Sequence, residues 1–217
     1  MGNLVFLKPD YIKAVPLTTS DIIAEYAKVN YRSIQRTIEK HQKRLEKFGQ
    51  VRFEITAVKY GRGTNDKKIY YLTEEQATLL ITFLKNTDVV ADFKTELVRQ
   101  FYEMRTELQK RQIAKSELRP TRRTLTDEIK SNPGHSEWDY KLYTDLAYKV
   151  ATGKIASQLR KERGASKNAV ALDYMTSDEI ALIEKLTYKI AVLYEMGMDY
   201  YQIKAILLNK RDKLLAS

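Results

Sequence analysis

The first quarter of the chain has apolar residues at the spacing of two consecutive helices. Thr18 to Asp21 has the spacing of a capping box, which predicts a short helix that ends near Ala27. Asn30 follows a turn and is a suitable N-cap for a second helix, which Gly49 ends. The apolar residues of this second helix recur at helical spacing: Ile34, Ile38, Leu45 and Phe48.

The next segment changes to the two-residue period of a strand. Apolar and polar residues alternate over 51–57, and a second strand is expected over 67–72. The turn-rich segment 60–66 between them predicts a β-hairpin with a basic tip. Thr73 to Gln76 is another capping box that opens a third helix, and a long helix is expected over 87–117.

Beyond residue 117 the pattern is helical throughout. Pro120 lies in a basic cluster, and we expect it to end the long helix and to separate a domain of residues 1–117 from one of residues 118–217. Capping-box spacing in the second domain begins at three residues: Thr124, Ser136 and Thr176. The expected fold is mainly α with a small β-hairpin, and a long helix connects the first domain to an all-helical C-terminal domain.

The long helix has apolar residues at close to heptad spacing, which is typical of a coiled-coil seam. This pattern predicts a homodimer whose interface contains five residues: Val90, Leu97, Phe101, Met104 and Leu108. The same positions also fit a single amphipathic helix that lies on its own domain. The sequence leaves both interpretations open.

Basic residues are concentrated in one part of the chain. The net charge is +10, and residues 28–68 hold twelve Lys or Arg residues against four Asp or Glu residues. An excess so localised indicates an acidic partner such as double-stranded DNA, whereas a solvated helix face and loop is the plainer interpretation. The chain has no Cys, no signal-peptide pattern at its N-terminus and no apolar stretch long enough to span a bilayer. We therefore expect a soluble cytoplasmic protein with no membrane partner.

The first two predicted helices have the spacing of a DNA-binding helix-turn-helix over 23–38. Ala24 is small, as the close crossing of the second helix requires, whereas the turn has Lys28 where such motifs usually have Gly. Lys28 therefore adopts a left-handed conformation, or the turn has another shape. A second helix presented in this way fits the major groove, and an ordinary helical hairpin with a solvated polar face is the alternative. The residues expected to contact DNA are Asn30, Tyr31, Arg32, Gln35, Arg36, Lys40 and Lys43.

The hairpin strengthens this interpretation, because helix, helix and hairpin is the order of elements in a winged helix. The N-terminal domain is therefore expected to be winged helix-turn-helix-like. Four basic residues of the hairpin are expected to contact phosphates: Lys59, Arg62, Lys67 and Lys68. The alternative is a basic hairpin that is only solvated.

No set of residues indicates catalysis, a metal site or a cofactor. His41 lies on the inward face of the second helix, where a packed, hydrogen-bonded histidine is expected rather than a base or a ligand. His135 lies beside Ser136 and Asp139 in a capping segment, and adjacency alone does not make a nucleophile triad. Two histidines and no Cys argue against a structural zinc site. We therefore predict no catalytic residue, no metal and no cofactor.

Ordered motifs in the first half of the chain resemble the Rha family of phage regulatory proteins. The resemblance lies in FGQVRFEI (48–55) and IYYLTEEQATLL (69–80), continues at Asn86-Thr87, and covers about residues 15–108. It implies an origin in a temperate phage or prophage, a place in the bacterial host cytoplasm and a role as regulator or antirepressor. It carries over no catalytic residue. LYTDLAYK (142–149) and QLRKERG (158–164) are similar to helical C-terminal regions of phage antirepressor-like proteins.

These patterns and the resemblance together favour two functions. The first is a transcriptional regulator that binds duplex DNA through the helix-turn-helix and the basic wing. The alternative is an antirepressor or adaptor that binds a repressor or a host protein without specific DNA binding, so that the basic patch meets an acidic protein surface. An enzyme is the least supported class.

Overall fold

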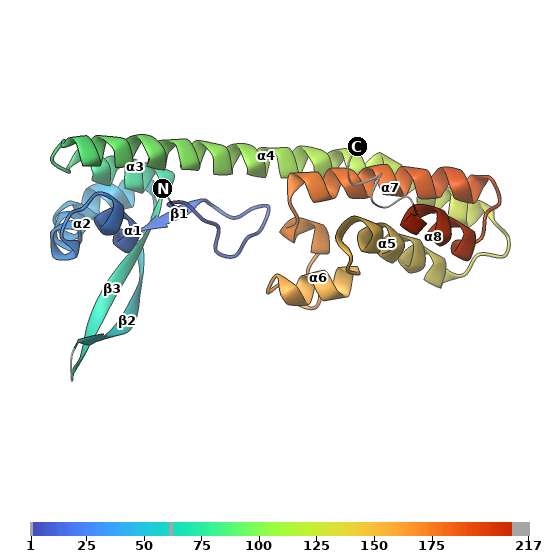
Figure 1. Cartoon of the computed structure of the whole chain (residues 1–217), viewed down its shortest axis with the longest axis horizontal. Helices are drawn as coiled ribbons and strands as arrows, with labels where there is room; N and C mark the ends of the chain where they lie inside the picture. The colour runs from blue at the N-terminus through green and yellow to red at the C-terminus, as the bar shows by residue number, and fades with distance from the viewer. Residues whose placement is uncertain (1, 61–62, 210–217) are drawn as a thin grey trace. The chain divides into compact units, whose positions relative to one another are not determined.

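The computed structural model describes residues 2–60 and 63–209, without the side chains of residues 59, 60 and 63–65. The described residues are mostly helical with one small antiparallel sheet, which confirms the predicted fold class (Figure 1). They form two compact units. We call these unit 1 (Met1–Pro9 and Ala14–Thr106) and unit 2 (Asp10–Lys13 and Glu107–Ser217).

Unit 1 contains the sheet and the helices that pack around it (Figure 1). Its elements before α4 are β1 (Leu17–Thr19), α1 (Ser20–Tyr26), α2 (Tyr31–Leu45), the 3-10 turn η1 (Glu46–Phe48), β2 (Arg52–Tyr60), β3 (Gly63–Thr73) and α3 (Glu74–Thr82). The predicted helices and hairpin are thus confirmed. The cap of α1 is one residue later than expected, because the Thr19 hydroxyl accepts a hydrogen bond from Ile22 N at 3.3 Å. Thr18 is fully buried in β1 instead.

The three strands pair in the order β1–β3–β2, and both pairs are antiparallel. In the hairpin, Arg52 pairs with Tyr71 and Thr56 pairs with Lys67. At the other edge of β3, Thr19 also pairs with Tyr71. The sequence does not predict β1, because three residues are too few to show an alternating pattern. Its pairing with β3 places the start of α1 beside the hairpin.

The first part of α4 (Asp88–Ser131) covers one side of the core of unit 1. Four of its residues are at most 3% exposed: Val90, Phe93, Leu97 and Phe101. Met104 is partly buried against the same core, and Leu108 is only 7% exposed. Val90, Leu97 and Phe101 are covered by the core of unit 1, so they are not available for the predicted dimer seam. That assignment is corrected to an amphipathic helix on its own domain, and a dimer through another surface stays a prediction.

The helix α4 continues through Pro120, so the predicted end of the helix is wrong. A proline inside a helix removes one backbone hydrogen bond and costs about 3 kcal/mol. Leu118 and Leu125, on either side of it, are 1% and 5% exposed in the core of unit 2. Burial of one leucine side chain contributes about 1.5–3 kcal/mol, so the two together offset the cost of the proline. Thr124 is consequently inside the helix and not at its start.

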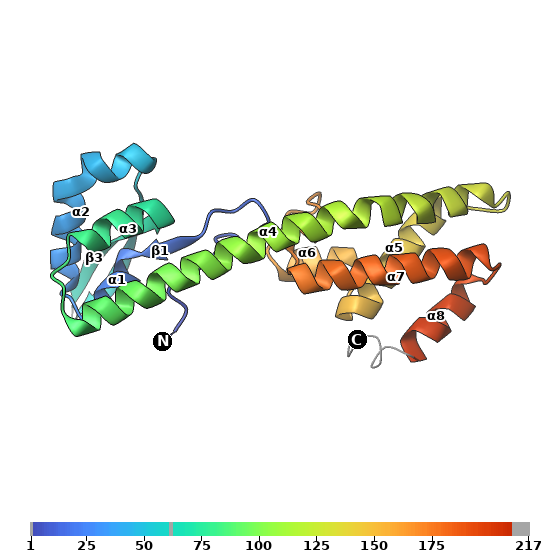
Figure 2. The ribbon, with the colours of Figure 1, turned by 90° about the horizontal axis from the view of Figure 1, so that it is seen from above.

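Unit 2 consists of helices among the residues described. After α4 they are α5 (Glu137–Thr152), α6 (Ala156–Glu162), the 3-10 turn η2 (Ala171–Tyr174), α7 (Ser177–Glu195) and α8 (Tyr200–Asn209). These helices and the second part of α4 enclose one apolar core (Figure 2). The predicted capping boxes at Ser136 and Thr176 are confirmed. Across the described part of the chain, no helix has the length and apolar character to cross a membrane.

The burial of α4 gives a direct test of the corrected role of its apolar residues. We expect Leu97→Ala to lower the free energy of unfolding of unit 1 by about 2–5 kcal/mol, because it leaves a cavity in the core. Val98 is the next residue and is 51% exposed, so Val98→Ala is the matched control and should change stability by less than about 0.5 kcal/mol. Urea denaturation followed by circular dichroism measures both. Equal losses of stability in Leu97→Ala and Val98→Ala would contradict the burial of Leu97 in unit 1. A wild-type stability that rises with protein concentration, and a Leu97→Ala stability that does not, would place Leu97 in a dimer interface.

Candidate nucleic-acid interface

The helices α1 and α2 form a tightly packed pair that presents one face of α2 to solvent. Ile23 and Ala24 of α1 are buried together with Ile34 and Ile38 of α2. The Asn30 side chain caps α2 by accepting a hydrogen bond from Arg32 N at 2.9 Å. The opposite face of α2 therefore stays outside the core.

The turn between α1 and α2 has the left-handed conformation that the sequence leaves as one of two alternatives. Lys28 has φ of 54°, and within the described residues it is the only non-glycine residue with a positive φ. Such a conformation costs roughly 1–2 kcal/mol for a residue with a Cβ. Burial of the neighbouring Ala27 at 2% exposure and the hydrogen bond from Val29 N to Ala24 O at 3.0 Å hold the turn in this shape.

The outward face of α2 carries four basic residues and one acidic residue, Glu39, whose carboxylate accepts a hydrogen bond from the Tyr70 hydroxyl at 3.2 Å. The four basic residues are exposed to solvent and lie at helical spacing: Arg32, Arg36, Lys40 and Lys43. With a rise of 1.5 Å per residue, they extend over about 16 Å. Among the described residues, no carboxylate lies within ion-pair distance of these four side chains. The cationic stripe, as we call these four residues, is therefore free to meet an anionic partner.

A groove of about 560 Å³ lies between the start of α2 and the hairpin. Its lining combines residues expected to contact DNA with two neighbours from the strands: Asn30, Tyr31, Arg32, Gln35, Val58, Asp66, Lys67 and Lys68. Gln35 is half-buried at this groove, one helical turn after Arg32. The structure thus brings together the early turns of α2 and the described hairpin cations. Arg62 and the side chain of Lys59 lie outside the described residues.

Tyr31 joins α2 to the hairpin instead of pointing freely outward. Its hydroxyl donates a hydrogen bond to the Lys68 carbonyl and lies 3.4 Å from Ser20 Oγ. Ser20 Oγ in turn accepts a hydrogen bond from Tyr70 N at 3.0 Å. Burial raises the pKa of Tyr31 above its ordinary value. The phenol is therefore a neutral structural donor at neutral pH, and its hydroxyl is committed within the protein.

The two described lysines of the hairpin are also engaged inside unit 1. Lys67 Nζ lies 2.6 Å from Asp21 Oδ1 and 4.4 Å from the centre of the Tyr31 ring. Lys68 Nζ lies 4.0 Å from the centre of the Phe53 ring, which is cation–π geometry. A lysine already paired with a carboxylate contributes less free charge to a ligand. Lys67 and Lys68 are therefore weaker sources of free positive charge than the four exposed basic residues of α2.

The histidines occupy packed or capping positions. His41 is half-buried and stacks on Phe83 of the segment after α3, with 3.9 Å between ring centres. Desolvation by burial, with help from the nearby charge of Arg44, lowers the pKa of His41 below its ordinary value. His135 lies in the loop before α5, where Nδ1 is 2.8 Å from the Asn132 carbonyl. Within residues 2–60 and 63–209 no group of three potential metal ligands occurs.

Sequence reasoning missed the partners of the hairpin. Ser20 and Asp21 were expected only as part of a helix start, yet they contact Tyr70 and Lys67 of β3. The contacts join residues about 50 positions apart, so no local spacing reveals them. The available signal was the combination of a hydroxyl and a carboxylate at the start of α1 with basic and aromatic residues in the strand.

Unit 1 is thus a small mixed domain with a solvent-exposed basic helix face. The family model of the phage regulatory protein Rha matches residues 18–106, which include α1, α2, the sheet, α3 and the first part of α4. The match agrees with the resemblance that the sequence shows to the Rha family. No curated protein shows a significant match to the chain.

The contact made by Tyr31 generates a prediction about the rigidity of the interface. Tyr31→Phe leaves the Lys68 carbonyl without its donor, and a polar group left unsatisfied in a half-buried site costs about 1–3 kcal/mol. We expect that loss in the unfolding free energy of unit 1, with faster amide exchange in β3. Tyr102 is 62% exposed, so Tyr102→Phe is the control. Identical stability and exchange in the two variants would show that Tyr31 does not hold the hairpin.

Proposed function

We propose that the protein is a phage-encoded regulator that binds duplex DNA with α2 in the major groove. The cationic stripe of α2 is the observation that carries this proposal, because it is exposed, helical and without internal carboxylate partners. The major groove is about 12 Å wide and admits one α-helix. The match of residues 18–106 to the family model of the phage regulatory protein Rha supports a regulatory role.

Within α2 the early turns have the chemistry for reading bases, and the later turns have the chemistry for binding phosphates. Gln35 presents an amide that pairs with adenine, and Arg36 presents a guanidinium that pairs with guanine. Lys40 and Lys43 follow on the same face, where ammonium groups neutralise phosphates without reading sequence. Helix-turn-helix proteins use the N-terminal residues of the second helix for base contacts, which matches this order.

The hairpin acts mainly as a support in this proposal. Tyr31 and Lys67 tie β3 to the starts of α2 and α1, so the hairpin fixes the orientation of the proposed recognition helix. A backbone contact from the hairpin to an adjacent phosphate is compatible with the winged helix arrangement. Two copies of the chain would place two recognition helices on paired half-sites, and this homodimer is part of the proposal.

The second candidate function is an antirepressor that binds a repressor or a host protein. The observation in its favour is that Lys67 and Lys68 are engaged within unit 1, which leaves these two lysines less free to bind a phosphate than lysines of a DNA-contacting wing are expected to be. Purification separates the two candidates. A DNA-binding protein copurifies with nucleic acid at low salt and loses it at high salt, whereas an antirepressor of this kind copurifies with a protein.

Salt dependence tests the proposed phosphate contacts. Each phosphate contact contributes about −0.9 to the slope of log K against log salt concentration. We therefore expect Lys40→Ala with Lys43→Ala to weaken binding to all duplexes and to reduce the magnitude of the slope by about 2. Lys110→Ala with Lys185→Ala removes the same charge from exposed positions of unit 2 and is the control.

Fluorescence anisotropy of a labelled duplex between low and moderate salt measures both slopes. Equal slopes in the two double variants would exclude α2 as the phosphate-binding element. Absence of binding at low salt, with varied DNA that includes the gene region of the protein, would overturn the proposal.

Base reading by α2 is tested separately, with a duplex sequence selected from a random library. We expect Gln35→Ala to lose about 1–3 kcal/mol of discrimination for that sequence, because a bidentate base contact is worth this amount. Weak binding to unrelated DNA should remain. Gln42→Ala changes an exposed residue of the same type on the same helix and is the control. If Gln35→Ala and Arg36→Ala keep the full preference while changes in the hairpin alter it, the hairpin reads the sequence.

A further inference from the structure

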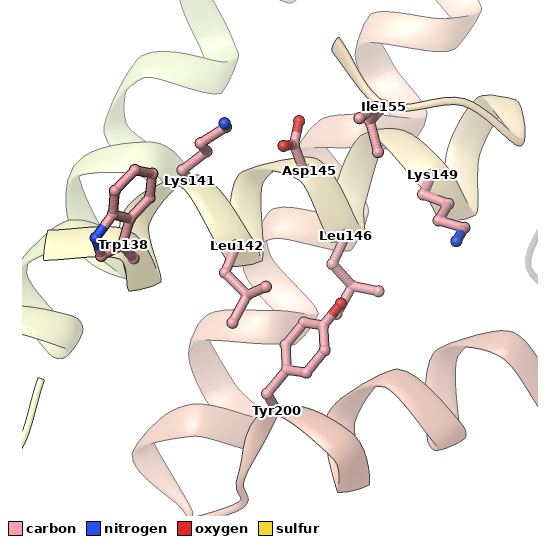
Figure 3. Close-up of a pocket in the computed structure, with 8 residues that line it drawn as sticks. All are labelled: Trp138, Lys141, Leu142, Asp145, Leu146, Lys149, Ile155 and Tyr200. Carbon is pink, nitrogen blue, oxygen red and sulfur yellow. The ribbon is translucent and has the colours of Figure 1, made fainter. Parts of the chain in front are cut away.

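Unit 2 has an apolar groove of about 370 Å³ along α5 (Figure 3). Leu142 and Leu146 of α5 point toward the ring of Tyr200, which comes from the first turn of α8. Trp138 stands at one end of the groove and Lys149 at the other. Trp138 is the single tryptophan of the chain and is 73% exposed.

The face of α5 that lines the groove is not the face that packs into the core of unit 2. The inner face of the helix is buried in the core of unit 2 through Tyr143, Ala147 and Val150. The core therefore does not need Trp138, and its indole remains largely in water. Large exposed aromatic residues beside apolar side chains are typical of protein interaction sites, where Trp and Tyr are enriched among the residues that dominate affinity.

The charges at the groove favour an acidic partner. Lys141 and Lys149 are exposed, and neither has a carboxylate partner in the described part of the chain. The one acidic residue of the lining, Asp145, accepts a hydrogen bond from Ala156 N at 3.3 Å, so its carboxylate is committed to the start of α6. Lys141 Nζ lies 5.8 Å from the centre of the Trp138 ring. The groove thus has an apolar floor, and its lining holds two ammonium groups against one carboxylate.

The geometry points to a docking groove for an acidic, amphipathic helical segment of another protein. From Trp138 to Lys149 the groove follows α5 for about 16 Å, which is three turns of a partner helix. An apolar stripe on that helix fits the floor made by Leu142 and Tyr200, beneath which Leu146 is buried. Carboxylates on its flanks pair with Lys141 and Lys149. This surface is independent of the proposed DNA interface of unit 1.

Two other occupants fit the groove less well. The phosphates of a nucleic acid would pair with the lysines, but they would also lie against the apolar floor. That contact would desolvate the phosphates and would give the apolar side chains no apolar partner. A second copy of the chain on the same face would form a two-fold symmetric contact, and this sets the same lysines of both copies close together. Like charges opposed at an interface lower affinity.

A synthetic peptide probe tests the inference with the full-length protein. The probe is an amphipathic helix with Leu and Phe at i, i+3, i+4 and i+7 and glutamates on its flanks, and the matched peptide has lysines in place of the glutamates. We expect the glutamate peptide to shift the emission of Trp138 to shorter wavelength in a saturable way, whereas the lysine peptide leaves it unchanged. Because Trp138 is the only tryptophan, the signal reports this groove alone.

Variants at exposed positions then locate the binding site by anisotropy of the labelled glutamate peptide. Trp138→Ala should weaken binding about 30-fold, as expected for an anchor worth about 2 kcal/mol. Lys141→Glu with Lys149→Glu should weaken the glutamate peptide and allow the lysine peptide to bind. Tyr188→Ala, at a 59% exposed position of α7, is the control and should change nothing.

Three outcomes would overturn the inference. The first two are equal binding of both peptides and binding of neither peptide. The third is a shift of Trp138 emission that occurs without peptide, on raising the protein concentration or on adding duplex DNA. Circular dichroism of each variant shows that the helices are retained, so a loss of peptide binding is not mistaken for a loss of fold. Failure of the peptide to bind leaves the DNA-binding tests of unit 1 unaffected, because they use other residues and another ligand.

Discussion

A buried hydrogen-bond network around Ser20 sets the arrangement of unit 1. Ser20 is 0% exposed, so its hydroxyl must find partners inside the protein. It accepts the hydrogen bond of Tyr70 N and lies beside the hydroxyl of Tyr31, which donates to the Lys68 carbonyl. The first residue of α1, the first residue of α2 and the middle of β3 are thereby held together. The orientation of the cationic stripe relative to the hairpin depends on this network.

Local signals were sufficient for most of the elements. Asn30, Thr73, Ser136 and Thr176 cap helices where the spacing predicted, because a cap is formed by a residue and its neighbours two or three positions later. The hairpin was predictable for the same reason, since alternation and a turn-rich loop are both local. The fold class therefore followed from the sequence alone.

Contacts between distant residues decided the features that the sequence did not reveal. Pro120 reads as a helix end, but the burial of Leu118 and Leu125 keeps α4 continuous. The apolar residues of α4 fit a dimer seam and a domain-covering helix equally well. Phe93 distinguishes the two, because it lies outside the heptad set and is nevertheless 0% exposed in the core of unit 1. The spacing of apolar residues does not show whether a core of the same domain is there for the helix to cover, so the sequence alone does not decide between the two interpretations.

The free charges of the candidate DNA interface also differ from the charges counted in the sequence. Residues 28–68 hold twelve basic residues, yet Lys67 is paired with Asp21 and Lys68 lies over an aromatic ring. A paired lysine gains less from a phosphate, because it first gives up its carboxylate partner. The unpaired cations of α2 have no such cost. In unit 2, Lys149 of α5 likewise has no ion pair in the described part of the chain, whereas Lys141 lies 5.8 Å from the centre of the Trp138 ring. Among the residues described, exposed basic side chains without an ion pair thus occur on one surface of each unit, and in unit 2 they lie beside an apolar groove. This difference in the neighbouring side chains is the physical basis for proposing DNA as the ligand of the first surface and a protein segment as the ligand of the second.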